Sequence, residues 1–322
     1  MGYRYFYFLC LTIFLLIISQ LFIASSKLKS NDHIHQNHFN QKYGIFSIIK
    51  PDSLDFAGEM VPIHISNIWE RLDKELLKNV YWQSNTLLYI KRANKYFPII
   101  EPILKQHNIP DDFKYLAVIE SGLEDVVSPS GAAGFWQLLK GTAREYEIDV
   151  NSSIDERYNL EKSTHAACFY LQEAYEKFGS WTMAAASYNM GKNGARRVIC
   201  EQNTDNYYNL YVNSETRRYV FRIIAVKEIL ENPNKYGFIY REQDLYYMPE
   251  YKIIEVDSTI ADLYVFCNEH HINYKLLKEL NPWIRKSVLP DASRKKYQIK
   301  IPLYSSKLLF DEIKDSSCVQ KK

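Results

Sequence analysis

The sequence of 322 residues has no C-x-x-C spacing among its five cysteines, which argues against a redox site or a cysteine-based metal site. It also lacks an excess of charge of either sign: the formal net charge is +2, so electrostatics give no support to a nucleic-acid partner. Strand-like alternation is nearly absent between residues 68 and 232, which argues against a sheet in that region. With 47% hydrophobic and 24% charged residues, the chain does not have the composition of a disordered protein.

The N-terminal segment is long and apolar. A mostly apolar run extends from residue 5 to residue 18, and after Ser19 and Gln20 it continues to Ala24. Small residues at positions 24–26 would suit a signal peptidase, whereas about 20 apolar residues also suffice to span a bilayer. We therefore predict that residues 1–26 are a signal peptide or a membrane anchor. In either case the protein is exported, to the periplasm or cell envelope, and is membrane-associated if the segment is not cleaved.

The segment that follows, residues 27–66, is polar and is predicted to be an irregular tether. Its three histidines, His33, His35 and His38, could in principle bind a metal, but a solvated tether is the favoured interpretation because no further ligand is nearby. Export would permit disulfides, and four cysteines allow three pairings. We favour mostly free or structural thiols for the cysteines beyond the N-terminal segment: Cys168, Cys200, Cys267 and Cys318.

Two folded regions follow. Apolar residues recur at helical spacing through residues 67–235, and turn signals such as Phe97-Pro98 separate the segments, which predicts an all-helical domain. Residues 246–304 read as a strand, two helices and a strand, and residues 305–322 as a tail. The predicted fold class is therefore mainly α, with a helical domain followed by a small α+β domain.

One predicted helix carries a carboxylate in an unusual place. The helix is expected to begin at Pro110, with two aspartates in its first turn, and to end at Gly122. Glu120 lies on the same stripe as the apolar residues at positions 113, 116 and 117. Burial on that stripe, and the exposed carbonyls of the last turn, would both raise the pKa of Glu120. A general acid that breaks a glycosidic bond needs this property.

Four motifs surround this helix in the chain. They are the Glu120-Ser121 pair, the run SPSGAAGFWQ at 128–137 with GTAR at 141–144, ASYNMG at 186–191 and ETRRY at 215–219. Together they closely resemble the lytic transglycosylase and goose-type lysozyme family, over roughly residues 69–230. The resemblance implies a lysozyme-like helical catalytic domain that acts on the glycan strands of peptidoglycan. It implies a lyase that needs no metal or cofactor, and we expect it to act as a monomer.

The resemblance also implies roles for individual residues. Glu120 would be the single catalytic acid and base, and Ser121 would lie beside it near the sugar. Residues 134–137 would line the glycan subsites, with Gly134 and Trp136 among them and Gln137 bonding to an acetamido group. Tyr188 would contact Glu120 or the sugar, Asn189 would hold its loop, and Glu215 would lie near the peptide-bearing side of the substrate.

Alternatives stay open for several of these residues. Tyr188 could be a core aromatic, Trp136 could serve packing alone, and Glu215 could be an N-terminal helix charge near Arg217 and Arg218. The sequence departs from the family pattern at four positions, which puts the detail of the subsites in doubt. These departures are Leu139 in place of a methionine, Lys140 in place of a proline, and Ser187 and Met190 in place of alanines.

A second catalytic carboxylate is not evident in any motif. Most glycosidases use two carboxylates, and the candidates here would be Glu124, Asp125, Asp149 and Asp155. The family chemistry implies that none is needed. Glu120 would protonate the leaving oxygen, and the 6-hydroxyl of N-acetylmuramic acid would attack the anomeric carbon to form a 1,6-anhydro end.

Residues 246–304 resemble a degenerate LysM module, which binds glycans containing N-acetylglucosamine. The matching residues lie at 260–263, 276–282 and 297–302. A purely structural addition is the alternative for this region, which we expect to fold separately. For the whole chain two other classes remain: a cell-wall binding protein that has lost activity, against which Glu120 argues, and a muramidase that uses water.

Overall fold

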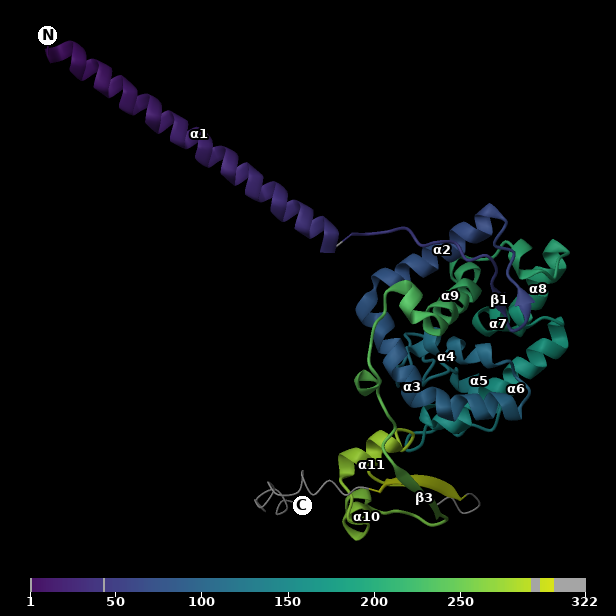
Figure 1. Cartoon of the computed structure of the whole chain (residues 1–322). Coiled ribbons are helices and arrows are strands. Elements are labelled where there is room, and N and C mark those ends of the chain that lie inside the picture. Colours follow the sequence, from purple (N-terminus) through teal and green to yellow (C-terminus); the bar gives the residue numbers. More distant parts are fainter. Residues whose placement is uncertain (1, 43, 291–295, 304–322) are drawn as a thin grey trace. The chain divides into compact units, whose positions relative to one another are not determined.

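The computed structural model describes residues 2–42, 44–290 and 296–303, with the side chains of residues 22–32, 39 and 42 also outside the description. The chain divides into two compact units, residues 1–49 and residues 50–322. Figure 1 shows the order of their elements along the chain. The predicted tail, residues 305–322, and Cys318 lie outside the described residues. The other four cysteines are free thiols, buried at positions 168 and 267 and exposed at positions 10 and 200.

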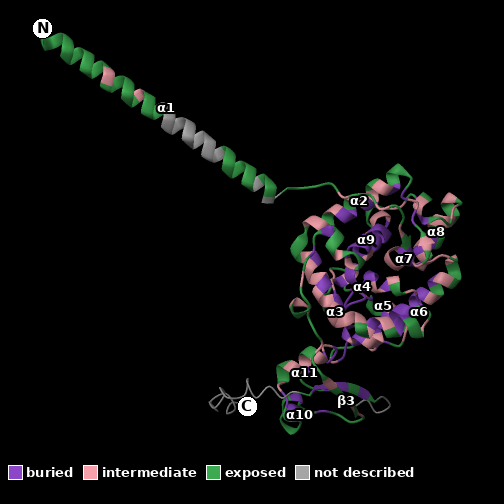
Figure 2. Cartoon of the chain, in the orientation of Figure 1, coloured by how far each residue is buried: buried purple, intermediate pink, exposed green. Residues whose placement is uncertain are grey.

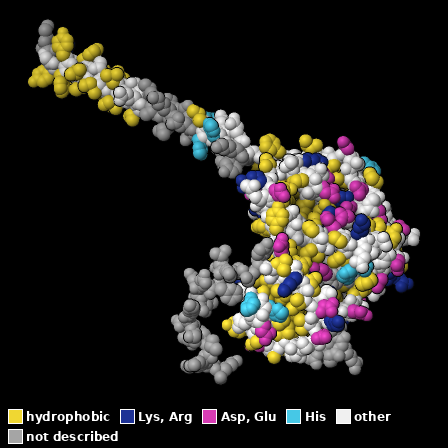
Figure 3. Space-filling view, turned by 60° about the horizontal axis from the view of Figure 1, so that its bottom comes forward, with side chains coloured by type: hydrophobic (Ala, Val, Ile, Leu, Met, Phe, Trp, Pro, Cys, Tyr) yellow, Lys and Arg dark blue, Asp and Glu magenta, His cyan; other side chains and the backbone are white. Residues whose placement is uncertain are grey.

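The first unit is dominated by one helix, α1 (Gly2–Lys42). Its stretch Gly2–Leu21 is long and apolar enough to cross a membrane, and none of it is buried. Hydrophobic side chains cover this part of the helix, while unit 2 mixes both signs of charge on the face drawn (Figure 3). The prediction of an irregular tether from residue 27 is wrong as far as Lys42. No proline or glycine interrupts residues 3–43, so nothing in this stretch breaks the helix.

The helical domain of unit 2 is built around two buried helices, α4 (Lys114–Ser121) and α9 (Ser214–Glu231), which pack against each other. Leu116, Val220 and Phe221 are fully buried between them and their neighbours, and Figure 2 shows buried residues concentrated on the inner faces of the helices. The surrounding helices are α2 (Ser66–Tyr81), α3 (Gln83–Gln106), α5 (Lys140–Glu145), α6 (Leu160–Phe178), α7 (Trp181–Met190) and α8 (Lys192–Gln202).

Helix α3 continues through Pro98 and Pro102, although Phe97-Pro98 was predicted to end a segment. Each proline removes one backbone donor from the helix. Ile100 and Leu104, which follow the two prolines, are fully buried. Their burial offsets the lost hydrogen bonds, so tertiary packing overrides the local signal.

A short hairpin precedes the helices, β1 (Asp55–Phe56) and β2 (Glu59–Met60). Phe56 is fully buried, with its ring centroid 5.2 Å from that of Phe113. The Glu59 carboxylate accepts hydrogen bonds at the start of α7, from the backbone N–H groups of Trp181 (2.6 Å) and Thr182 (3.0 Å). The predicted tether up to residue 66 therefore needs correction: its last part, from about residue 54, is built into the domain.

The C-terminal region has the predicted order of strand, helix, helix and strand. Strand β3 (Tyr251–Val256) pairs antiparallel with β4 (Tyr297–Pro302), and α10 (Leu263–Glu269) and α11 (Tyr274–Leu280) lie between them in sequence. The prediction of a mainly α chain with a small α+β region is confirmed. The apolar core of this region is shared, however, because Ala133, Ile154 and Tyr158 of the helical domain belong to the same buried cluster.

Candidate active site

Glu120 lies in the last turn of α4, as predicted. The helix ends at Gly122, which adopts the left-handed conformation (φ 64°) and donates its N–H to the carbonyl of Val118 at 2.8 Å. A glycine takes this conformation without the steric cost that a Cβ would bring. The end of the helix therefore fixes the backbone position of Glu120, next to the buried apolar face of α4 and close to the protein surface.

The Glu120 carboxylate has three polar neighbours. The phenol of Tyr219 on α9 donates a hydrogen bond to its Oε1. Burial raises the pKa of Glu120, and the negative charge of Glu215 adds to this, while the Tyr219 hydrogen bond and the charge of Arg222 oppose it. The net direction is upward, which is the direction expected for a group that must carry a proton near neutral pH. The same burial, with the Glu120 charge, raises the pKa of the Tyr219 phenol well above its ordinary value, so that it remains a donor.

A cavity of about 730 Å³ opens in front of Glu120. Its lining is mostly polar and comes from the loop before α5, from α5 and α6, from the junction of α7 and α8 and from the start of α9. We call it the cleft. Among its lining residues are Glu120, Ser130, Ala132, Gln137, Leu138, Leu139, Tyr188, Asn189, Lys192 and Glu215.

Four of the predicted substrate-binding residues line the cleft. Gln137 is one of them. Its Nε2 donates to two backbone carbonyls, those of Val126 (3.0 Å) and Gly134 (2.9 Å). Asn189 donates to the Glu215 carboxylate at 3.2 Å and accepts from the Thr216 hydroxyl at 2.8 Å. These bonds tie the end of α7 to the first turn of α9.

Tyr188 also lines the cleft, but it does not bond to Glu120. Its phenol donates to the carbonyl of Trp136 at 2.8 Å. The phenol that contacts Glu120 belongs to Tyr219, to which the sequence reasoning gave no role. Tyr219 is the last residue of the ETRRY motif and lies one helical turn after Glu215 on α9, so its spacing was the available signal.

The remaining three predicted substrate contacts are not among the residues that line the cleft. Ser121 is buried, and its hydroxyl donates to the carbonyl of Phe135 at 2.9 Å. Trp136 is fully buried, and its indole N–H donates to the Thr164 hydroxyl at 2.8 Å. Their polar atoms are occupied inside the domain, so Ser121 and Trp136 support the cleft and do not line it.

Gly134 is the third of these residues. It has a positive φ of 75°, and a Cβ at this position would lie 2.0 Å from the backbone oxygen of Arg157. Glycine is required there by the close approach of two backbone segments. The residue shapes the loop that carries Gln137, and it is not among the residues that line the cleft.

The carboxylates that the sequence offers as catalytic partners of Glu120 lie elsewhere. Glu124 forms an ion pair with Arg92, and Asp155 pairs with Arg157 at 2.7 Å. Asp125 lines a different cavity, where burial raises its pKa to about 6 against the opposing charges of Arg285 and Lys95. None of the four sequence candidates lines the cleft. Two carboxylates to which no catalytic role was assigned do line it, those of Glu145 and Glu215.

Within the described residues no three His, Cys, Asp or Glu side chains come together as metal ligands. His33, His35 and His38 lie on α1, and their side chains are exposed. The described part of the cleft therefore offers proton-transfer groups and hydrogen-bonding groups, arranged around one half-buried carboxyl.

Comparison with known families finds a match within each domain. Residues 97–211 match the transglycosylase SLT domain, and residues 252–305 match the soluble lytic transglycosylase C-terminal LysM-like domain. The predicted succession of a lytic transglycosylase domain and a LysM-like domain is thereby confirmed.

Among curated proteins the chain is similar to membrane-bound lytic murein transglycosylase D of two Escherichia coli strains, with 30% identity over 191 residues. The match covers 56% of this chain and 41% of each relative, so the chain spans about two fifths of the length of those relatives. Among solved structures, the 70-kDa soluble lytic transglycosylase of Escherichia coli is 19% identical, with a TM-score of 0.38 over 60% of this chain and 39% of that one. An inactive mutant of the lytic transglycosylase Slt of Pseudomonas aeruginosa is also 19% identical, with a TM-score of 0.34 over 47% of this chain and 26% of that one.

Proposed function

We propose that this chain, which carries a transglycosylase SLT domain and a LysM-like domain, is a peptidoglycan lytic transglycosylase with Glu120 as its single acid and base. The bond cleaved would be the β-1,4 bond between N-acetylmuramic acid and N-acetylglucosamine. The observation that carries the proposal is the position of Glu120: a half-buried carboxyl with a raised pKa, held by Tyr219, at the wall of a polar cleft.

The chemistry needs one group that first donates a proton and then accepts one. Protonated Glu120 gives its proton to the glycosidic oxygen, and the bond from that oxygen to the anomeric carbon breaks. The 6-hydroxyl of the same muramic acid residue then bonds to the anomeric carbon, and its proton returns to Glu120. Because the nucleophile belongs to the substrate, its effective concentration is high and no water has to be activated. A positioned acid and base contributes about 10²–10⁴-fold in rate.

The cleft residues have complementary tasks in this proposal. Both described hydrogen bonds of the Gln137 Nε2 go to backbone carbonyls, so its side-chain oxygen is the atom left to accept from an acetamido N–H. Tyr219 holds the Glu120 carboxyl in one orientation through both proton transfers. Asn189 fixes Glu215, which contributes negative charge beside Glu120 and favours its protonated form.

A second candidate function is supported by Glu215. It lines the same cleft and acts electrostatically on Glu120, so it is the described carboxylate best placed to activate a water molecule in a muramidase. Substitution separates the two functions. Glu120→Gln should abolish digestion of purified sacculi in either case. Glu215→Gln should leave the turnover within about tenfold if the 6-hydroxyl is the nucleophile, and should abolish it if Glu215 activates water.

The terminal regions extend the proposal. We expect the apolar segment Gly2–Leu21 to direct export, with retention as an anchor somewhat favoured over cleavage after Ser26. N-terminal sequencing of the protein isolated from membranes distinguishes the two, and recovery of the uncleaved chain from the cytosol would contradict both. We expect the LysM-like domain to bind glycan weakly. Retention of the full-length Glu120→Gln protein on insoluble sacculi measures this without digestion of the support.

A further inference from the structure

One wall of the cleft is a loop, residues 128–139, which we call the wall loop. It supplies Gln137, Leu138 and Leu139 to the cleft. The loop is closed on itself by two backbone hydrogen bonds between Ala133 and Leu138, of 3.1 and 3.2 Å. Gln137 has a positive φ of 46°, which costs free energy for a residue with a Cβ and persists only where the surroundings enforce it. The position of this wall therefore depends on what holds the loop.

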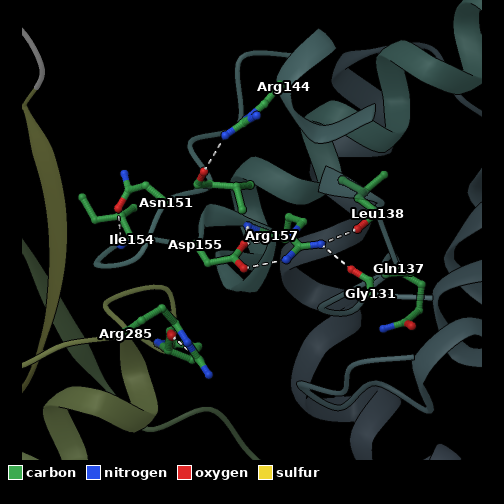
Figure 4. A network of polar contacts seen from close by, with 12 residues as sticks. Gly131, Gln137, Leu138, Arg144, Asn151, Ile154, Asp155, Arg157 and Arg285 are labelled. Atoms are coloured by element: carbon green, nitrogen blue, oxygen red, sulfur yellow. Dashed lines mark hydrogen bonds and ion pairs between the residues drawn. The ribbon is translucent and has the colours of Figure 1, made fainter. Parts of the chain in front are cut away.

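One guanidinium joins the two ends of the loop to the segment around Asp155, in addition to the contacts that Ser121, Thr164 and Tyr188 make with its middle. Arg157 donates from Nη1 to the carbonyls of Gly131 (2.7 Å) and Leu138 (3.0 Å), near the two ends of the loop. Figure 4 shows the side chain of Arg157 lying between the wall loop and Asp155. Its other edge donates to the Asp155 carboxylate, at 2.9 Å from Nε and 2.7 Å from Nη2. This two-point geometry is specific to arginine, because an ammonium group has no planar fork.

The segment that carries Asp155 and Arg157 is also where the LysM-like domain attaches. The N–H of Asp155 donates to the carbonyl of Trp283 (2.9 Å), and the N–H of Arg285 donates to the carbonyl of Ser153 (2.8 Å). Between these two bonds, Ile154 and Ile284 form an antiparallel bridge, and both are buried. The two domains are thus joined by one isolated antiparallel bridge, next to Asp155, the residue that orients Arg157.

The wall loop is also part of the shared core. Ala133 belongs to the buried cluster that contains Trp283, Ile284 and the apolar residues of the LysM-like domain. Hydrogen bonds connect the LysM-like domain to residues 153–157 and these residues to the wall loop. Apolar packing connects the LysM-like domain to the wall loop as well. Residues 246–304 therefore share their apolar core with the helical domain, whereas the sequence predicts that they fold separately.

We propose that Arg157 is a positioning residue for the cleft and that the LysM-like domain, docked on residues 153–155, completes the active site by holding Arg157 and the wall loop in place. The proposal rests on the proposed function for its catalytic consequence. Its structural part, that docking orders the wall loop, stands without it. A purely stabilising role for Arg157 would lower the unfolding temperature without a local effect on the wall loop.

The test uses full-length variants and two readouts. Arg285→Pro removes the N–H that donates to Ser153 together with the side chain. The matched control Arg285→Ala keeps that N–H and removes only the side chain, with its contact on the Tyr158 ring at 4.3 Å. Arg157→Lys keeps a charge next to Asp155 but loses the fork. Hydrogen exchange of the Ala133 and Leu138 amides reports on the wall loop, and kcat and KM on purified glycan strands report on the cleft.

In Arg285→Pro and in Arg157→Lys, we expect the wall-loop amides to exchange at least tenfold faster, and kcat/KM to fall about 10–100-fold. Amides of α6 should exchange as in the wild type, and Arg285→Ala, which keeps the backbone bond to Ser153, should change both readouts less than Arg285→Pro. Amide exchange and kinetics that stay unchanged in Arg157→Lys would overturn the proposal. This outcome decides the question even if Arg285→Pro fails to fold. An inactive wild type with a wall loop that still responds to Arg285→Pro would refute the proposed function and leave the docking inference standing.

Discussion

The contact between Gly134 and the backbone of Arg157 can be tested with two glycines of the same loop. Gly131 and Gly134 both have a positive φ, of 81° and 75°. A Cβ on Gly131 would meet nothing within 4 Å, whereas a Cβ on Gly134 would lie 2.0 Å from the Arg157 oxygen. The pair therefore separates the cost of the backbone conformation from the cost of the steric clash.

Gly131→Ala should cost only the left-handed conformation, about 1–2 kcal/mol. Gly134→Ala should lose that amount and, in addition, roughly 1–3 kcal/mol for overpacking against a backbone atom. For a folded unit of this size, each kcal/mol lowers the unfolding temperature by about 2–4 °C. Thermal unfolding followed by circular dichroism measures both changes. Activity on sacculi below the transition should fall in Gly134→Ala more than in Gly131→Ala, because the displaced backbone carries Gln137.

Equal losses of stability in the two variants would refute this reasoning. They would show that the two backbone segments separate at little cost, so that the wall loop is not held where the structure places it. A Gly134→Ala protein with full stability and full activity would contradict both the close approach and its importance for the cleft.

Three further outcomes are expected. Tyr219→Phe removes a hydrogen bond worth about 1.5–3 kcal/mol to the Glu120 carboxylate, so the turnover should fall about 10–100-fold. Because this bond lowers the pKa of Glu120, the alkaline limb of the pH–rate profile should move to higher pH in the same variant. The pKa of Glu120 is raised in the folded protein, so the wild type loses stability as the pH rises above 4.5. Glu120→Gln should therefore be more stable than the wild type at pH 8 in denaturant titrations, and the difference should shrink toward pH 4.5. Glu59→Ala should cost about 1–2 kcal/mol of unfolding free energy, measured in urea, because the carboxylate caps α7; no loss would mean that the hairpin is not part of the domain.

The helix that carries Glu120 was predictable because local chemistry determines it. The terminal glycine marks its end, and the apolar spacing places Glu120 on the buried stripe. The proline and the two aspartates mark a 3₁₀ turn, Asp111–Phe113, so the α-helix begins at Lys114 and not at Pro110 as predicted. The contact between Glu120 and Tyr219 joins residues 99 positions apart in the chain. No periodicity reports such a contact, so only the motif that ends at Tyr219 pointed to it.

The roles of adjacent residues within one motif were harder to predict. Trp136 and Gln137 are adjacent, yet the indole is fully buried and bonds to Thr164, while Gln137 lines the cleft. The motif shows that both residues belong to one loop, but the direction of each side chain follows from the loop backbone, which includes the positive φ values of Gly134 and Gln137. The sequence alone could not predict that combination.

The docking of the LysM-like domain had no sequence signal of its own. Two of its polar contacts are backbone hydrogen bonds, from Asp155 to Trp283 and from Arg285 to Ser153, which any residues other than proline at the donor positions could make. The ion pair between Lys300 and Glu161 (2.6 Å) joins residues too far apart in the chain for a local pattern to indicate it. The hairpin at residues 55–60 was missed for a similar reason, since two-residue strands carry too little alternation to be recognised.

The mass of the sugar product tests the central claim most directly. Purified sacculi are digested with the wild-type protein, with Glu120→Gln as the control, and the released muropeptides are analysed by mass spectrometry. An attack by the 6-hydroxyl forms a 1,6-anhydro end, lighter by one water than the product of hydrolysis. We predict anhydro products from the wild type and none from Glu120→Gln. Reducing-end products from the wild type, or anhydro products from Glu120→Gln, would contradict the account.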